Sequence, residues 1–86
     1  MKIKSGFYLK NIDGVMVVQC ENAAIPMNNI VLGETATFLW EVLSREDMSK
    51  EQLLHALLDR FEISTVLALN DIDVFVKTVR ENGIIE

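Results

Sequence analysis

The hydrophobic pattern of this 86-residue chain changes its period near Gly33. Before Gly33, β-branched and aromatic residues form short runs of the kind found in strands. After Gly33, apolar residues recur at i, i+3, i+4 and i+7, which is the spacing of an amphipathic helix. A strand-rich start and a helical finish are typical of the α+β class, in which a small antiparallel sheet packs on helices. Because chains this short rarely divide, we expect residues 1–86 to form a single domain.

A β-hairpin is predicted near the start of the chain. The runs Phe7–Ile12 and Val15–Cys20 suit a pleated surface, and Asp13 and Gly14 lie between them. An Asp-Gly pair is a strong hairpin signal, because a type I′ turn needs a positive φ at both central residues. We therefore expect the two runs to pair as antiparallel strands.

A third, short strand is expected at Ile30–Leu32, directly before Gly33. Residues 23–27 are ambiguous, because Pro26 restricts any strand there to an edge of the sheet. The antiparallel sheet is therefore predicted within residues 7–32, with three strands, or with four if residues 23–27 pair.

Three helices are predicted to pack on this sheet, at residues 34–43, 49–61 and 65–82. The second begins with a capping box, in which Ser49 caps the helix and Gln52 reaches back to the cap. The third ends before Gly83, a residue type that favours the left-handed conformation just beyond a helix end.

The third helix has apolar residues on more than one side. Its main stripe, which must face the core, consists of Ala68, Ile72, Phe75 and Val79. Leu69 and Val76 lie on one shoulder of that stripe, whereas Leu67 and Val74 lie on the opposite side. Two interpretations of the shoulder stay open: Leu69 and Val76 widen the core contact, or they line a groove beside the strand Ile30–Leu32.

The second interpretation predicts a site for an extended peptide. An exposed strand edge beside an apolar helix can bind a peptide by β-augmentation, with backbone hydrogen bonds from the edge and side-chain pockets from the helix. The candidate peptide-binding residues are then Ile30, Val31, Leu32, Leu69, Asp73, Val76 and Arg80. The same edge could instead pair with its own copy and give a homodimer.

The charge distribution disfavours nucleic acid as a partner. The formal net charge is −5, and residues 44–86 hold nine acidic and five basic groups. Nucleic-acid affinity depends on clustered Lys and Arg, and the chain has no such cluster. Lys77 and Arg80 share the third helix with Asp71, Asp73 and Glu81, which makes it a poor recognition helix for DNA.

The residue types that carry catalysis or metal binding are sparse. His55 is the one histidine and Cys20 the one cysteine, so a disulfide within the chain and a thiolate metal cluster are both excluded. Asp71 and Asp73 are two residues apart on a helix and point to different sides. Nucleophile-elbow and phosphate-cradling glycine motifs are absent. We expect a non-catalytic protein without a metal or a cofactor.

The chain has neither a secretory signal at its start nor an apolar run long enough to cross a membrane. The expected location is therefore the cytoplasm, with no membrane partner.

Three segments resemble the pyrroloquinoline-quinone biosynthesis protein D (PqqD) family. Residues 30–41, which read IVLGETATFLWE, are similar to its strand-to-helix junction, although Gly33 stands where many relatives carry Asn. Residues 49–61 resemble its middle helix. Its closing helix and tail are matched by Asp71, Ile72, Phe75, Val76, Val79, Gly83, Ile84 and Ile85.

The resemblance implies a winged-helix-like recognition element without catalytic residues. Members of this family act as peptide chaperones, which bind the leader of a ribosomally made precursor peptide between the third strand and the third helix. They present it to a modifying enzyme, often a radical SAM enzyme. The alternatives are a structural subunit of a larger enzyme complex and a winged-helix regulator that binds DNA. A carrier protein is disfavoured, because that class resembles a helical bundle with an Asp-Ser-Leu motif.

Overall fold

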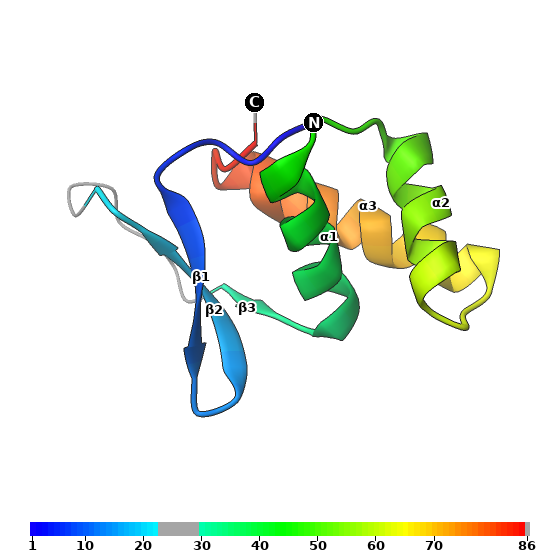
Figure 1. Cartoon of the computed structure of the whole chain (residues 1–86), viewed down its shortest axis with the longest axis horizontal. Helices are drawn as coiled ribbons and strands as arrows, with labels where there is room; N and C mark the ends of the chain where they lie inside the picture. The colour runs from blue at the N-terminus through cyan, green and yellow to red at the C-terminus, as the bar shows by residue number, and fades with distance from the viewer. Residues whose placement is uncertain (23–29, 86) are drawn as a thin grey trace.

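The computed structural model describes residues 1–22 and 30–85, which form three strands and three helices (Figure 1). In chain order these are β1 (Phe7–Ile12), β2 (Val15–Cys20), β3 (Val31–Leu32), α1 (Glu34–Arg45), α2 (Lys50–Arg60) and α3 (Thr65–Glu81). The strands stand at one end of the molecule and the helices at the other. The α+β class and all three helices are confirmed. The alternative fourth strand at residues 23–27 lies outside the described residues.

The sheet has the order β1-β2-β3, and both pairs of neighbouring strands are antiparallel. The predicted turn between β1 and β2 is confirmed, since Asp13 and Gly14 have φ values of 53° and 84°. The Gly14 N–H donates to the Asn11 side-chain oxygen at 2.8 Å, which closes this turn. The third predicted strand is confirmed as Val31–Leu32.

Side chains from all three helices and from the inner face of the sheet form the hydrophobic core. The predicted stripe of α3 is buried, with exposed fractions of 0% for Ala68, Ile72 and Val79 and 2% for Phe75. Leu39 and Leu43 of α1 and Leu53 and Leu57 of α2 are also completely buried. None of the described residues is a buried polar or charged residue. Burial of apolar surface therefore fixes the position of α3.

The capping signals in the sequence mark real helix ends. The Ser49 hydroxyl accepts a hydrogen bond from the Gln52 N–H at 3.1 Å, and the Gln52 side chain accepts one from the Ser49 N–H at 2.9 Å. This is the predicted capping box at the start of α2. Gly33 takes the N-cap position of α1 without a side-chain hydrogen bond.

The segments at the two ends of the chain meet beside the helices (Figure 1). Ile3 and Ile85 form an antiparallel bridge, and the Lys4 N–H donates to the Ile84 carbonyl at 2.8 Å. The Ile3 N–H donates to the Leu43 carbonyl of α1 at 3.1 Å. Because Ile3, Ile84 and Ile85 are all buried, this pairing ties the end of α3 to α1.

Gly83 makes that connection possible. The Gly83 N–H donates to the Arg80 carbonyl at 3.1 Å, and the Ile84 N–H donates to the Val79 carbonyl at 2.8 Å. These two bonds form a Schellman motif, in which the residue after the helix takes a left-handed conformation. Gly83 has a φ of 66°, which confirms its predicted role.

Replacing Gly83 should destabilise the fold through the backbone alone. A Cβ at this position meets nothing within 4 Å, so the effect of Gly83→Ala comes from the positive φ. We expect a loss of about 1 kcal/mol in the free energy of unfolding. Gly83→Asn is the matched control, because Asn tolerates this conformation and should lose less. Urea denaturation measures both variants; equal stability of Gly83→Ala and the unchanged protein would contradict this account.

Candidate functional site

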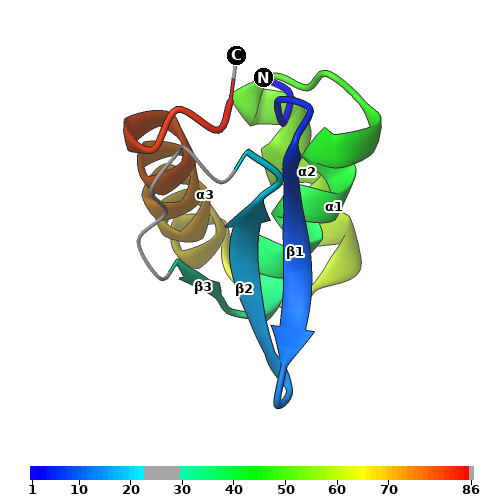
Figure 2. The same cartoon turned by 90° about the vertical axis from the view of Figure 1, so that its left-hand side faces the viewer.

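β3 forms one edge of the sheet, with β2 between it and β1 (Figure 2). The Val18 N–H donates to the Ile30 carbonyl at 2.9 Å, and the ladder pairs Val17 with Val31. In an antiparallel ladder, pairs that exchange hydrogen bonds alternate with pairs that do not. Val31 therefore belongs to a pair without hydrogen bonds, and its N–H and carbonyl point away from β2. Within residues 1–22 and 30–85, no strand pairs with that side of β3.

The side chains of β3 alternate between the two faces of the sheet. Leu32 lies in the core with 7% of its surface exposed, whereas Val31 is 58% exposed. Val31 lies beside Val17 in the ladder and points to the outer face. Val31 thus combines an exposed apolar side chain with an N–H and a carbonyl that no strand pairs with in the described part of the chain.

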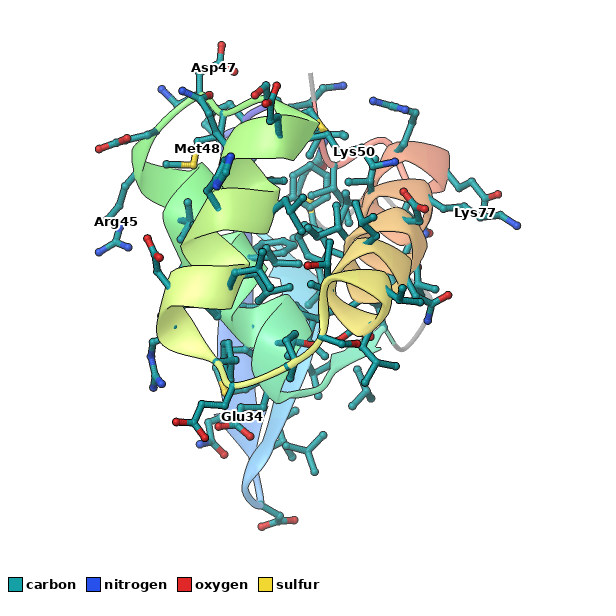
Figure 3. All side chains as sticks on the ribbon, turned by 90° about the vertical axis from the view of Figure 1, so that its right-hand side faces the viewer. Glu34, Arg45, Asp47, Met48, Lys50 and Lys77 are labelled. Atoms are coloured by element: carbon teal, nitrogen blue, oxygen red, sulfur yellow. The ribbon has the colours of Figure 1, made fainter. Side chains whose placement is uncertain are left out.

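α3 lies near the edge of the sheet that β3 forms, away from β1 (Figure 2). Two sides of this helix flank its buried stripe. In both Figure 2 and Figure 3, β3 lies on the side of α3 opposite the first turn of α2. Steps of about 100° per residue place Leu67 and Val74 on the flank that faces away from α2. The exposed fractions of these two side chains are 57% and 58%. We call Leu67 and Val74 the outer flank of α3.

The other flank of α3 faces the beginning of α2. Asp73, Val76 and Arg80 line a cleft of about 590 Å³ together with Ser49 and Lys50. The Lys50 ammonium and the Asp73 carboxylate form an ion pair across this cleft. We call this flank of α3 the inner flank. Leu69 shares it by helical stepping and is half-buried.

The predicted site residues are therefore divided between two places. Ile30, Val31 and Leu32 lie together at the sheet edge, as predicted. The four predicted residues of α3 lie on the inner flank instead of beside β3. Val76 packs partly buried against the core and also lines the cleft beside α2, so both interpretations of the shoulder stay open.

Sequence reasoning missed the outer flank, although one signal pointed to it. Leu67 and Val74 were separated from the core stripe by their helical angle, and apolar residues so placed are exposed unless another element covers them.

A second cleft, of about 570 Å³, lies between the hairpin tip, β3 and α1. Its apolar lining includes Val31, Phe38 and Phe61.

Chemically reactive side chains do not gather among the described residues. No group of three or more His, Cys, Asp or Glu side chains there could hold a metal ion. His55 is exposed on α2, and Cys20 is a half-buried free cysteine at the end of β2. The Met1 amino group donates to the Asp47 carboxylate at 2.6 Å and lowers the pKa of Asp47 through this hydrogen bond and its charge.

None of the helices in the described part of the chain is long and apolar enough to cross a membrane.

Comparison with known proteins gives two matches. The family model for Coenzyme PQQ synthesis protein D (PqqD) matches residues 23–85. Among solved structures, the chain is similar to TbiB1 in complex with the TbiA(beta) leader peptide, with a TM-score of 0.72 and 17% sequence identity. That likeness covers 100% of this chain and 95% of the TbiB1 chain, and it shows a shared fold. No curated protein matches the sequence.

The family match extends from the segment before β3 to the bridge that follows α3. It includes the sheet edge, both flanks of α3 and all three helices, which is far more than half of the chain. The resemblance seen in the sequence is thereby confirmed, and the chain belongs to the PqqD family.

Proposed function

We propose that this domain binds the leader of a ribosomally made precursor peptide at the edge of β3 and presents it to a modifying enzyme. The observation that carries the proposal is the position of Val31 at the sheet edge: its N–H and carbonyl point away from β2, and no other strand among residues 1–22 and 30–85 pairs with them. Membership of the PqqD family supports it, and so does the likeness to TbiB1, which was solved with a leader peptide.

A leader segment would bind as a further strand of the sheet. Its backbone would exchange hydrogen bonds with Val31, and its side chains would alternate between the outer face of the sheet and α3. The side chains directed at α3 would contact Leu67 and Val74. Burial of this exposed apolar surface contributes about 25 cal/mol per Å², so apolar leader residues would be favoured there.

The finer features of the proposal concern the partners. From the family resemblance we infer that the modifying enzyme is of the radical SAM type. The cytoplasm, predicted from the sequence, stays the proposed location of the complex. The domain itself would bind without catalysing a reaction. Leader contacts with the inner flank stay a prediction for Leu69, Asp73, Val76 and Arg80. A peptide bound at β3 would have to cross α3 to make them.

Affinity capture would test the function directly. The immobilised domain and a Val31→Pro variant would be exposed in parallel to lysate of the source cells, and bound peptides would be identified by mass spectrometry. We expect the unchanged domain to retain a short precursor peptide that the variant releases. Capture of one large protein without a peptide, equally by both domains, would favour the structural-subunit alternative.

Val31→Pro should weaken binding of the recovered leader peptide. Proline removes the Val31 N–H, which points away from β2, and it leaves the hydrogen bonds between β2 and β3 in place. Because a net hydrogen bond contributes about 1 kcal/mol and the ring also blocks close approach, we expect a loss of about tenfold or more in affinity. Isothermal titration calorimetry measures the loss.

Val31→Thr is the matched control for that variant. It keeps the shape of the side chain and the backbone N–H, so its affinity should stay within about threefold of the unchanged domain. Unchanged affinity in a folded Val31→Pro variant would sink strand addition as the binding mode.

Substitutions on α3 would decide which flank receives the leader. Val74→Asp places a charge on the outer flank, and we expect it to reduce leader affinity by about tenfold because the carboxylate opposes apolar burial. Val66→Asp is the matched control for the added charge on the outer flank, since Val66 is 76% exposed and lies on the side of α3 that carries Asp73. Arg80→Ala tests the inner flank. Fluorescence anisotropy with a labelled leader would measure all three; a loss in Arg80→Ala alone would instead support the residues predicted from the sequence.

A further inference from the structure

The cleft between the inner flank of α3 and the start of α2 is separate from the sheet edge. It has a volume of about 590 Å³. Figure 3 shows Lys50 at the start of α2, above α3, and Lys77 projecting from α3. Besides Met1 and Ser49, the residues that line it are Lys50, Asp73, Val76, Lys77, Arg80 and Glu81. We call it the basic cleft.

The basic cleft has a net positive charge, whereas residues 44–86 as a whole have a net negative charge. Residues 44–86 contain five basic and nine acidic side chains, an excess of four negative charges. Three of these five basic side chains line the basic cleft, against the two acidic side chains Asp73 and Glu81, which leaves an excess of one positive charge. A positive site on an acidic surface attracts a negatively charged partner selectively.

Two of the basic side chains are free to bind such a partner. Lys50 is already paired with Asp73. Lys77 and Arg80 are both exposed, and neither forms an ion pair with any other described residue. A guanidinium binds a carboxylate through two parallel hydrogen bonds, so Arg80 can orient a carboxylate as well as attract it.

Val76 adds an apolar contact between these charges. It is half-buried against the core and lines the basic cleft, so part of its surface remains open to a ligand. A ligand that satisfies both features carries carboxylates next to an apolar side chain. This combination fits a short protein segment better than it fits a nucleic acid, whose phosphates require several basic groups along a stripe.

We infer that the basic cleft binds an acidic, partly apolar segment of a second protein. β3 and the first turn of α2 lie on opposite sides of α3, so a peptide on β3 and a segment held between Lys50 and Arg80 could be bound together. The cleft would dock the domain on a partner while the edge of β3 stays open. The inference does not rest on leader binding at the edge of β3. Asp73, Val76 and Arg80 are also among the leader-binding residues predicted from the sequence, and the Val31→Pro variant below distinguishes the two sites.

A displayed library of random 12-residue peptides tests the inference. The library would be selected on the unchanged domain, and each enriched peptide would then be titrated against a Lys77→Glu/Arg80→Glu double variant. We expect the enriched peptides to carry Asp or Glu beside an apolar residue. Their affinity should fall at least tenfold in the double variant, and it should weaken as salt rises, because the charges are exposed.

A second double variant, Lys4→Glu/Lys10→Glu, makes the same charge change on exposed residues outside the basic cleft and should keep the affinity. Enrichment without acidic residues, or equal binding to both double variants, would overturn the inference. So would a single-stranded oligonucleotide that displaces the peptides from this cleft. Selected peptides that bind Val31→Pro as well as the unchanged domain support a separate site, whereas loss of binding in that variant would show that the peptides bind at the edge of β3.

Discussion

The hydrogen bond from the Val18 N–H to the Ile30 carbonyl sets the register between β2 and β3, and the proposed binding edge depends on that register. With this pairing, Leu32 faces the core and Val31 faces solvent, while the backbone groups of Val31 point to the open side of the sheet. A shift by one residue would exchange the two side chains and would turn the free N–H toward β2. The buried Leu32 makes such a shift unfavourable, so the core itself fixes the direction of the edge.

α3 connects this edge with the rest of the molecule. Its buried stripe is held between α1 and α2, and its C-terminal end is tied down by Gly83 and by the bridge between Ile3 and Ile85. With the helix fixed in this way, its two flanks become separate surfaces. On the outer flank Leu67 and Val74 are exposed and apolar, whereas the inner flank carries Arg80 and faces the charged start of α2. One helix thus presents side chains of different chemistry on different sides.

Much of this fold could be predicted from the sequence, because its signals are local. Asp13 and Gly14, the capping box at Ser49 and the left-handed Gly83 each specify a conformation within a few residues. The stripe of α3 is nearly as local, since it depends on helical periodicity alone. The flank that faces β3 could not be obtained in this way. Helical stepping gives the positions of Val76 and Val74 relative to the core stripe. Tertiary packing alone decides that α2 lies on the side of Val76 and β3 on the side of Val74.

The direction of the Val31 N–H and carbonyl could not be predicted from the sequence either, because it depends on how β3 pairs with β2. It can be tested by amide hydrogen exchange, measured by NMR with and without the leader peptide. The account predicts that the Val31 amide exchanges freely in the unbound domain and becomes protected when the peptide binds as a neighbouring strand. A bound peptide that leaves the Val31 amide unprotected would contradict binding at this edge.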